Sequence, residues 1–147
     1  MATAMTKPIR KITQRELIPA KPMQVYEALI DARKHAEFTG SKATCDPKAG
    51  GKFTAWDGYI SGRNLILEPG RRIVQEWKTT EWPTGYSPSI VEFTFKEKGD
   101  VTELTMVHSK VPAKQAASYR EGWIDFYWKP LKEYFQKRTY SAEALGE

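Results

Sequence analysis

Near the C-terminal end of the chain, from Gln115 to Arg138, apolar and polar residues recur with the period of an amphipathic helix. At about 100° per residue, the apolar residues fall on one broad face and the charged residues on the other. The centre of the apolar face holds Ala116, Tyr119, Trp123, Tyr127, Pro130 and Tyr134, with Phe126 on one flank and Ile124, Trp128, Leu131 and Phe135 on the other. This face spans roughly 200°, so we expect the rest of the chain to wrap around the helix.

Two residues weaken this helix locally. Pro130 has no backbone N–H, so it leaves the carbonyl of Phe126 without its usual donor and should bend the helix axis. Gly122 lowers helix propensity by about 1 kcal/mol relative to alanine.

Upstream, from Gly51 onward, apolar residues recur with a period of two, which is typical of strands with one buried face. The predicted strands are Gly51–Trp56, Tyr59–Leu67, Ile73–Thr79, Ile90–Glu97 and Thr102–Lys110. Short turns separate most of them, which favours antiparallel neighbours. Before them the pattern predicts a strand over Ile9–Ile18, a helix from Pro22 to about Ile30, a second helix over Ala32–Phe38 and a loop over Gly40–Gly50.

These elements predict an α+β fold in which a curved antiparallel sheet offers one apolar face to the long helix. A length of 147 residues is most simply one domain, and no linker or internal repeat is visible. We expect a domain core from about residue 9 to residue 138, with flexible ends at 1–8 and 139–147.

The composition of the chain is that of a globular protein without a membrane span or a secretory signal. An apolar content of 40% and a charged content of 28% are ordinary for a soluble globular protein. No apolar run approaches the ~20 residues that span a membrane, and Met1–Lys11 lacks the apolar core of a secretory signal. Cys45 is the only cysteine, which excludes an internal disulfide and fits a reducing compartment. We therefore expect a cytoplasmic protein with no membrane contact.

The net charge of +5 raises the question of nucleic-acid binding. The basic residues are scattered along the chain, however, and most have acidic neighbours. No basic stripe or nucleic-acid-binding motif is present, so we expect no nucleic-acid partner.

No catalytic, metal or cofactor motif stands out. Cys45 lies in a turn-rich stretch without a nucleophile motif that would pair it with His35 or His108. Two histidines and one cysteine without ligand spacing do not make a metal site. The paired glycines at 50 and 51 precede a predicted strand rather than a helix, so they do not form a phosphate-binding loop. We expect no catalytic residues, no metal and no cofactor.

The order of elements and a series of short motifs resemble one known family. The motifs are Glu37-Phe38-Thr39, Gly50-Gly51-Lys52-Phe53, Asp57-Gly58-Tyr59-Ile60-Ser61-Gly62, Trp77, Trp82-Pro83-Thr84-Gly85, Thr102-Glu103-Leu104, Pro112-Ala113, Gly122-Trp123 and Phe126-Tyr127. Together, from about Ile9 to Phe135, they look like the C-terminal domain of the activator of heat-shock-protein-90 ATPase. The resemblance implies the helix-grip fold, which START domains, birch-pollen allergens and polyketide cyclases (the SRPBCC superfamily) share.

The resemblance also implies possible functions in stress response. One is a co-chaperone role through contact with a heat-shock-protein-90-type chaperone. The two-domain eukaryotic activators of this family carry a separate N-terminal domain for which these 147 residues leave no room, so we expect any such contact to be weak. A second is binding of a hydrophobic small molecule in a cavity between sheet and helix. The alternative from another class is an enzyme resembling a polyketide cyclase or dehydratase, with His108 as acid or base.

The residues that would line such a cavity are those predicted to face the helix from the sheet, or the sheet from the helix. They are Phe53, Tyr59, Gln75, Trp77, Phe93, Met106, His108, Trp123 and Tyr127. The same residues would equally fill a closed core, and His108 is then a core histidine satisfied by a neighbouring hydroxyl or carbonyl. Trp82 and Tyr86 lie in the long loop between two strands, where they either pack on the rim or form a patch for a protein partner.

Overall fold

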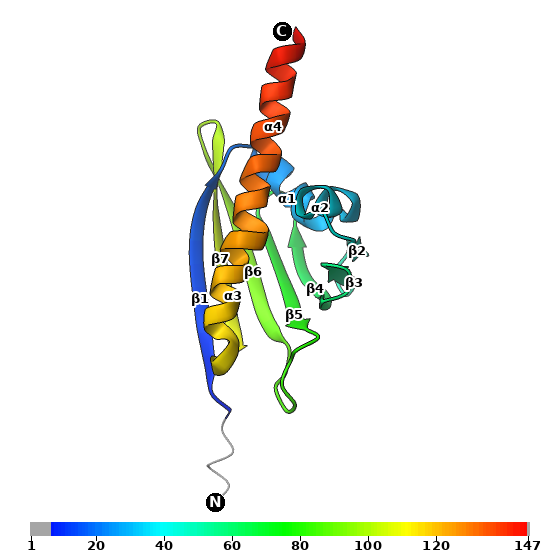
Figure 1. Cartoon of the computed structure of the whole chain (residues 1–147), viewed down its shortest axis with the longest axis vertical. Helices are drawn as coiled ribbons and strands as arrows, with labels where there is room; N and C mark the ends of the chain where they lie inside the picture. Colours follow the sequence, from blue (N-terminus) through cyan, green and yellow to red (C-terminus); the bar gives the residue numbers. More distant parts are fainter. Residues whose placement is uncertain (1–6, 147) are drawn as a thin grey trace, which may run out of the picture.

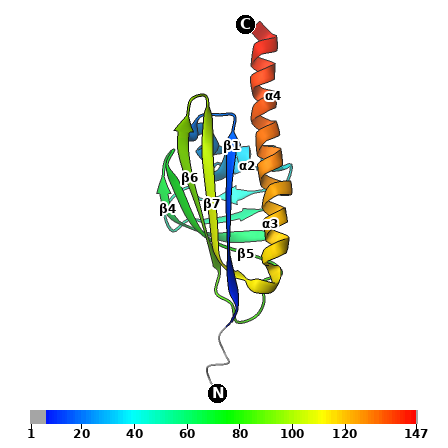
Figure 2. The ribbon, with the colours of Figure 1, turned by 90° about the vertical axis from the view of Figure 1, so that its left-hand side faces the viewer.

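A seven-stranded antiparallel sheet, in the order β1-β7-β6-β5-β4-β3-β2, forms one layer of the computed structural model, which describes residues 7–146 and the side chains of 7–137. Its strands are β1 Ile9–Ile18, β2 Thr44–Cys45, β3 Lys52–Ala55, β4 Ile60–Glu68, β5 Arg72–Thr79, β6 Ser89–Lys98 and β7 Val101–Pro112. The sheet curves around one face of the C-terminal helix (Figures 1 and 2), which confirms the predicted helix-grip fold. The prediction missed β2, which pairs Thr44 with Thr54 inside the expected loop.

Two short helices cover one end of the sheet (Figure 1). They are α1, Pro22–Ile30, and α2, Ala32–Thr39, close to their predicted bounds. The Asp31 carboxylate accepts a hydrogen bond from the Lys34 backbone N–H and so caps α2, while Gly40 ends it in the left-handed conformation.

The long helix is continuous but not uniform. A short 3-10 turn, Ala113–Gln115, leads into α3, Ala116–Trp123, then into a π-helical segment, η3, Ile124–Trp128, and finally into α4, Lys129–Gly146. In the π segment the Lys129 N–H donates to the carbonyl of Ile124, five residues earlier. Pro130 accounts for this segment, because a wider turn relieves the clash of its ring with the preceding turn. The helix also runs past its predicted end at Arg138.

The π segment changes which residues face the sheet, and here the prediction was wrong. A uniform helix would keep Tyr127, Pro130 and Tyr134 at the centre of the apolar face. Tyr127 is buried as predicted, but beyond it Trp128, Leu131 and Phe135 are the buried residues, whereas Pro130 and Tyr134 are half-buried. The extra residue in the turn rotates the following helix, so residues predicted on the flank become the centre.

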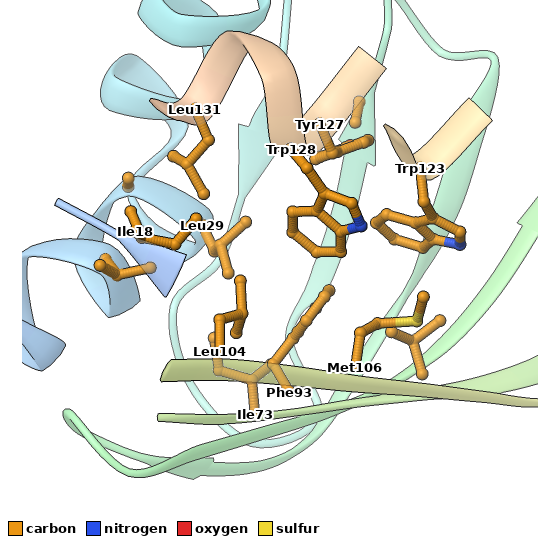
Figure 3. Packing of buried hydrophobic residues seen from close by; sticks show 14 of the residues in the cluster. Ile18, Leu29, Ile73, Phe93, Leu104, Met106, Trp123, Tyr127, Trp128 and Leu131 are labelled. Carbon is orange, nitrogen blue, oxygen red and sulfur yellow. The ribbon is translucent and has the colours of Figure 1, made fainter. Parts of the chain in front are cut away.

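Aromatic side chains from the helix fill the space above the sheet (Figure 3). The rings of Trp123 and Trp128 stack at a centroid distance of 5.5 Å, a spacing of five residues that suits the π segment. Phe93 of β6 meets both indoles edge to face, at 5.8 and 6.3 Å. The Trp128 indole N–H also donates to the Gln14 side chain, 2.6 Å away, which ties the helix to edge strand β1.

Gly62 permits a close approach between strands at the edge of this core. A β-carbon at this position would lie 1.8 Å from the carbonyl oxygen of Glu76 and 2.8 Å from the Phe53 ring. Only glycine therefore fits this position.

Residues 139–146 of the predicted flexible C-terminal end continue helix α4, and residues 1–6 and 147 lie outside the described part, so the flexibility of both ends stays a prediction. Within the described part, no helix is both long and apolar enough to span a bilayer.

Candidate functional site: an aromatic cavity beneath the long helix

A cavity of about 360 Å³ lies between the long helix and the β3–β4 hairpin. The helix contributes Ser118, Tyr119, Gly122, Trp123, Phe126 and Tyr127, and the sheet side contributes Trp56, Tyr59, Ile60 and Trp77. Tyr59 and Phe126 are 37% and 55% exposed, so the cavity reaches the surface between them. Its volume falls within the range of small-molecule sites, and seven of its ten lining residues are aromatic.

Gly122 leaves the helix wall of the cavity without a side chain. A β-carbon built on it would meet only a Phe126 ring carbon, at 3.8 Å. Gly122 lowers the helix propensity of the sequence, but in the folded protein its missing side chain leaves space in the cavity.

The opposite lip of the cavity is a tight turn in the left-handed region of backbone space. Trp56, Asp57 and Gly58 have φ angles of 52°, 56° and 87°. A left-handed tryptophan is strained, and such strain often marks functional segments. The turn holds the Trp56 ring edge to face with Phe126, at 5.4 Å. Among the described residues the buried Trp56 indole N–H makes no hydrogen bond of ordinary geometry, although it interacts with the Tyr127 hydroxyl.

The structure separates the predicted cavity residues into three groups. Tyr59, Trp77, Trp123 and Tyr127 line the cavity. Phe53 and Gln75 instead border a small space of about 20 Å³ beside α2. Phe93, Met106 and His108 are buried in the core and do not line the cavity.

Sequence reasoning did not assign six of the lining residues to the cavity: Trp56, Ile60, Ser118, Tyr119, Gly122 and Phe126. Tyr119 and Phe126 were signalled by their place on or beside the apolar face of the helix. Trp56 carried no such signal, because the backbone of the turn determines where its ring lies.

His108 is a fully buried histidine with both ring nitrogens satisfied. The Ser89 hydroxyl donates to the carbonyl of Trp77 at 2.6 Å, so its oxygen accepts the Nε2–H of His108 at 2.8 Å. The Trp123 indole N–H donates to Nδ1 at 3.0 Å. This network fixes a neutral imidazole that carries its proton on Nε2.

Burial lowers the pKa of His108 to about 3, because the charged form would lose its hydration. Protonation of Nδ1 would also set two donors against each other. The imidazole therefore has no free nitrogen to offer a substrate, and the geometry does not support the alternative in which His108 acts as acid or base.

A second histidine ties the cavity to the short helices. The Tyr127 hydroxyl donates to His35 Nε2 at 3.0 Å, while His35 Nδ1 donates to the carbonyl of Leu29 at 3.1 Å. The side chain is only half-buried, but both nitrogens are engaged, and burial lowers the pKa of His35 to about 4. Burial also raises the pKa of Tyr127.

Two tyrosine hydroxyls at the cavity rim already form hydrogen bonds with other residues. The Tyr59 hydroxyl donates to the Glu81 carboxylate at 2.6 Å, and burial followed by this hydrogen bond raises the pKa of Tyr59. The Tyr119 hydroxyl lies 2.7 Å from that of Thr79, and burial raises the pKa of Tyr119. Each tyrosine thus holds its proton more tightly than usual and stays protonated at neutral pH, so neither offers a phenolate to act as a base.

Cys45 does not form a reactive centre. Its sulfur accepts a weak hydrogen bond from the Asn64 amide at 3.7 Å, and burial raises the pKa of its thiol. Across the described residues, no three metal-ligating side chains come together.

Trp82 and Tyr86 pack on the rim rather than forming an open aromatic patch. Trp82 stacks on Tyr119 at 6.1 Å, and its indole N–H donates to the carbonyl of Ser87. The Tyr86 hydroxyl donates to the carbonyl of Pro8 at 3.2 Å. The two aromatics anchor the long loop, which is the rim-packing alternative.

The family model described as "Activator of Hsp90 ATPase homolog 1-like protein" matches residues 19–136. The chain belongs to this family. Activator of 90 kDa heat shock protein ATPase homolog 1 of Homo sapiens is 34% identical over 128 residues, covering 87% of this chain and 38% of the human protein. The homolog of Dictyostelium discoideum is 33% identical over 124 residues, covering 83% of this chain and 32% of that protein. The chain thus spans less than half the length of either relative.

Solved structures of the family and its neighbours share the fold. An HSP90 activator from Plasmodium falciparum has a TM-score of 0.79 at 25% identity and covers 86% of this chain and 96% of its own. CalU16 from Micromonospora echinospora has a TM-score of 0.67 at 29% identity, with coverage of 80% and 71%.

Proposed function

We propose that this protein is a non-enzymatic binding domain that holds a flat, apolar small molecule in the cavity beneath its long helix. The observation that carries the proposal is the open volume of about 360 Å³, walled by aromatic rings and left unfilled at Gly122. A well-packed core leaves few voids larger than a water molecule, so a surface-connected cavity of this size supports a binding role.

The chemistry of the walls favours binding over catalysis. General acid–base catalysis needs a titratable group within hydrogen-bond reach of the substrate and with a pKa near the working pH. The tyrosines that line the cavity have raised pKa values, and His108 lies outside it. Aromatic walls instead suit a ligand that stacks and buries apolar area.

A cavity-filling variant tests the proposal. Gly122→Leu should place its side chain in the cavity and weaken binding of unsubstituted anthraquinone by about tenfold or more, because ligand and side chain compete for one volume. The readout is quenching of tryptophan fluorescence, since Trp56, Trp77 and Trp123 line the walls. Leucine is also a better helix former than glycine, so the fold should persist.

Glu121→Leu is the matched control, because it adds the same side chain on an exposed position of the same turn. Its affinity should stay within about twofold of the wild type. Equal binding by Gly122→Leu, or no saturable binding by the wild type, would reject the cavity as a ligand site.

Contact with a chaperone is the second candidate function. It is supported by membership of the family and by relatives named activators of a 90 kDa heat shock protein ATPase. The two candidate functions do not exclude each other.

A further inference from the structure

β1 begins, β7 ends and the long helix starts at one end of the molecule (Figures 1 and 2), and five basic residues lie in or beside these segments. We call this surface the basic end and define it as Lys7, Arg10, Lys11, Lys110 and Lys114, all of which are exposed. None of the three segments that build it, 7–11, 109–114 and 83–89, contains an aspartate or glutamate. Within the described side chains, none of the five cations forms an ion pair.

The pairing of β1 with β7 brings these residues together. Arg10 lies opposite Val111, and the Ala113 N–H donates to the carbonyl of Pro8. The Lys7 ammonium sits 5.9 Å from the centre of the Tyr86 ring, so the β5–β6 loop also borders the surface. The residues are scattered in sequence, which is why sequence analysis saw no basic patch.

A β-bulge puts Lys110 on this surface. Between the pairs Arg10–Val111 and Ile12–His108, Ser109 and Lys110 together oppose Lys11 alone. Strict alternation would turn Lys110 inward with Met106 and His108, which are fully buried. The bulge lets it face solvent, with φ at 60°, a left-handed conformation that glycine adopts far more readily. A strained lysine where glycine would be relaxed is an observation independent of the charge cluster.

We propose that the basic end is a docking surface for an acidic segment of a protein partner. Exposed cations without ion-pair partners, grouped at one end of the sheet, attract carboxylates and speed encounter. Single-stranded nucleic acid would need open aromatic faces for base stacking, whereas Trp82 stacks on Tyr119 and Tyr86 is half-buried beneath Lys7. A membrane surface would need a broader apolar face, and of the exposed large hydrophobics only Ile9 lies within the three segments. This proposal does not rest on the cavity.

The test measures binding of a fluorescein-labelled peptide of alternating glutamate and serine by fluorescence anisotropy. The wild type should bind it at low salt and more weakly at moderate salt, because the screening length falls to about 10 Å at 0.1 M. The variant Lys11→Ala/Lys110→Gly/Lys114→Ala should bind about tenfold more weakly or worse. It should also be no less stable to heat, since Lys110→Gly relieves backbone strain.

Lys42→Ala/Lys52→Ala/Lys96→Ala is the matched control, because it removes three exposed lysines elsewhere. It should retain affinity within about threefold, since more distant charges are largely screened. The cavity-filled Gly122→Leu variant should bind the peptide as the wild type does, which separates this proposal from the cavity.

Three results would overturn the proposal. An equal loss of affinity in the control variant would mean that net charge alone explains peptide binding. Absence of peptide binding at low salt would mean that the cations serve only to keep the protein soluble. Tighter binding of labelled oligothymidine or of phosphatidylserine vesicles, lost in the same variant, would assign the surface to phosphate groups instead.

Discussion

The ring of His108 accepts a hydrogen bond on one nitrogen and donates one from the other, and both partners are buried with it. A charged imidazole at this position would lose hydration and oppose the Trp123 donor. The same residue that alternation placed on an inward face is therefore a structural group that links β6, β7 and the helix.

This burial makes stability depend on pH. The folded pKa of His108 is about 3, below the ordinary value of 6.5, so between these values the unfolded chain binds a proton that the folded chain does not. The contribution of His108 to the free energy of unfolding should be fully present above pH 6.5 and should decline as pH falls toward 3. The slope for this histidine should reach about 1.4 kcal/mol per pH unit.

The test is urea denaturation of wild type and His108→Gln between pH 7.5 and 4.5. At neutral pH the variant should be less stable by about 1–3 kcal/mol, because the hydrogen bonds of a buried group are disturbed. Its stability should also fall less steeply with acidification. His35→Gln is the comparison: it keeps the contribution of His108 and loses that of His35, whose folded pKa is about 4. Parallel pH profiles for wild type and His108→Gln would refute this account.

At the scale of the element, the π segment at Ile124–Trp128 divides the residues of the long helix between core and cavity. It brings Trp123 and Trp128 into a stack over the sheet while leaving Phe126 exposed at the cavity mouth. The helix therefore anchors the core and lines the candidate site with neighbouring residues.

Truncation of the two side chains should have unequal effects. Trp123→Ala should lower the free energy of unfolding by about 3–5 kcal/mol, because a large buried side chain and its hydrogen bond to His108 are lost. Phe126→Ala should cost less than about 1 kcal/mol, since the ring is 55% exposed. Chemical denaturation measures both, and similar losses would mean that the helix does not anchor the core as described.

At the scale of the whole molecule, the two proposed binding sites lie in different places. The cavity opens beneath the helix beside the β3–β4 hairpin, and the basic end lies where β1 and β7 meet. The human relative is longer, since this chain covers 38% of it. A domain tested alone lacks the gain in effective concentration that a tethered second contact would supply.

We therefore expect weak, salt-sensitive binding to a 90 kDa heat-shock chaperone. Labelled protein titrated with the chaperone should bind with a Kd of roughly 100 µM or weaker at low salt, and more weakly at moderate salt. The Glu121→Leu variant, altered away from the basic end, should behave as the wild type. No binding at either salt concentration, in an assay that detects a Kd of about 1 mM, would exclude the chaperone as a partner.

The sequence by itself determined the order of the elements and most of their bounds. Periods of two and of 3.6 are local properties, and short turns between strands leave antiparallel pairing as the simple outcome. The sequence also predicted that Tyr59, Trp77, Trp123 and Tyr127 face the space between the sheet and the helix, and these four line the cavity.

Only the tertiary structure decided which inward residues fill the core and which border open space. The π segment rotated the second half of the helix, the left-handed turn at Trp56 set the cavity lip, and the bulge at Lys110 turned a lysine out of the inner face. Each is a departure from regular geometry by one residue or one turn. Periodic patterns assume regular geometry, so they cannot reveal such departures. The cavity depends on the first two of them and the basic end on the third.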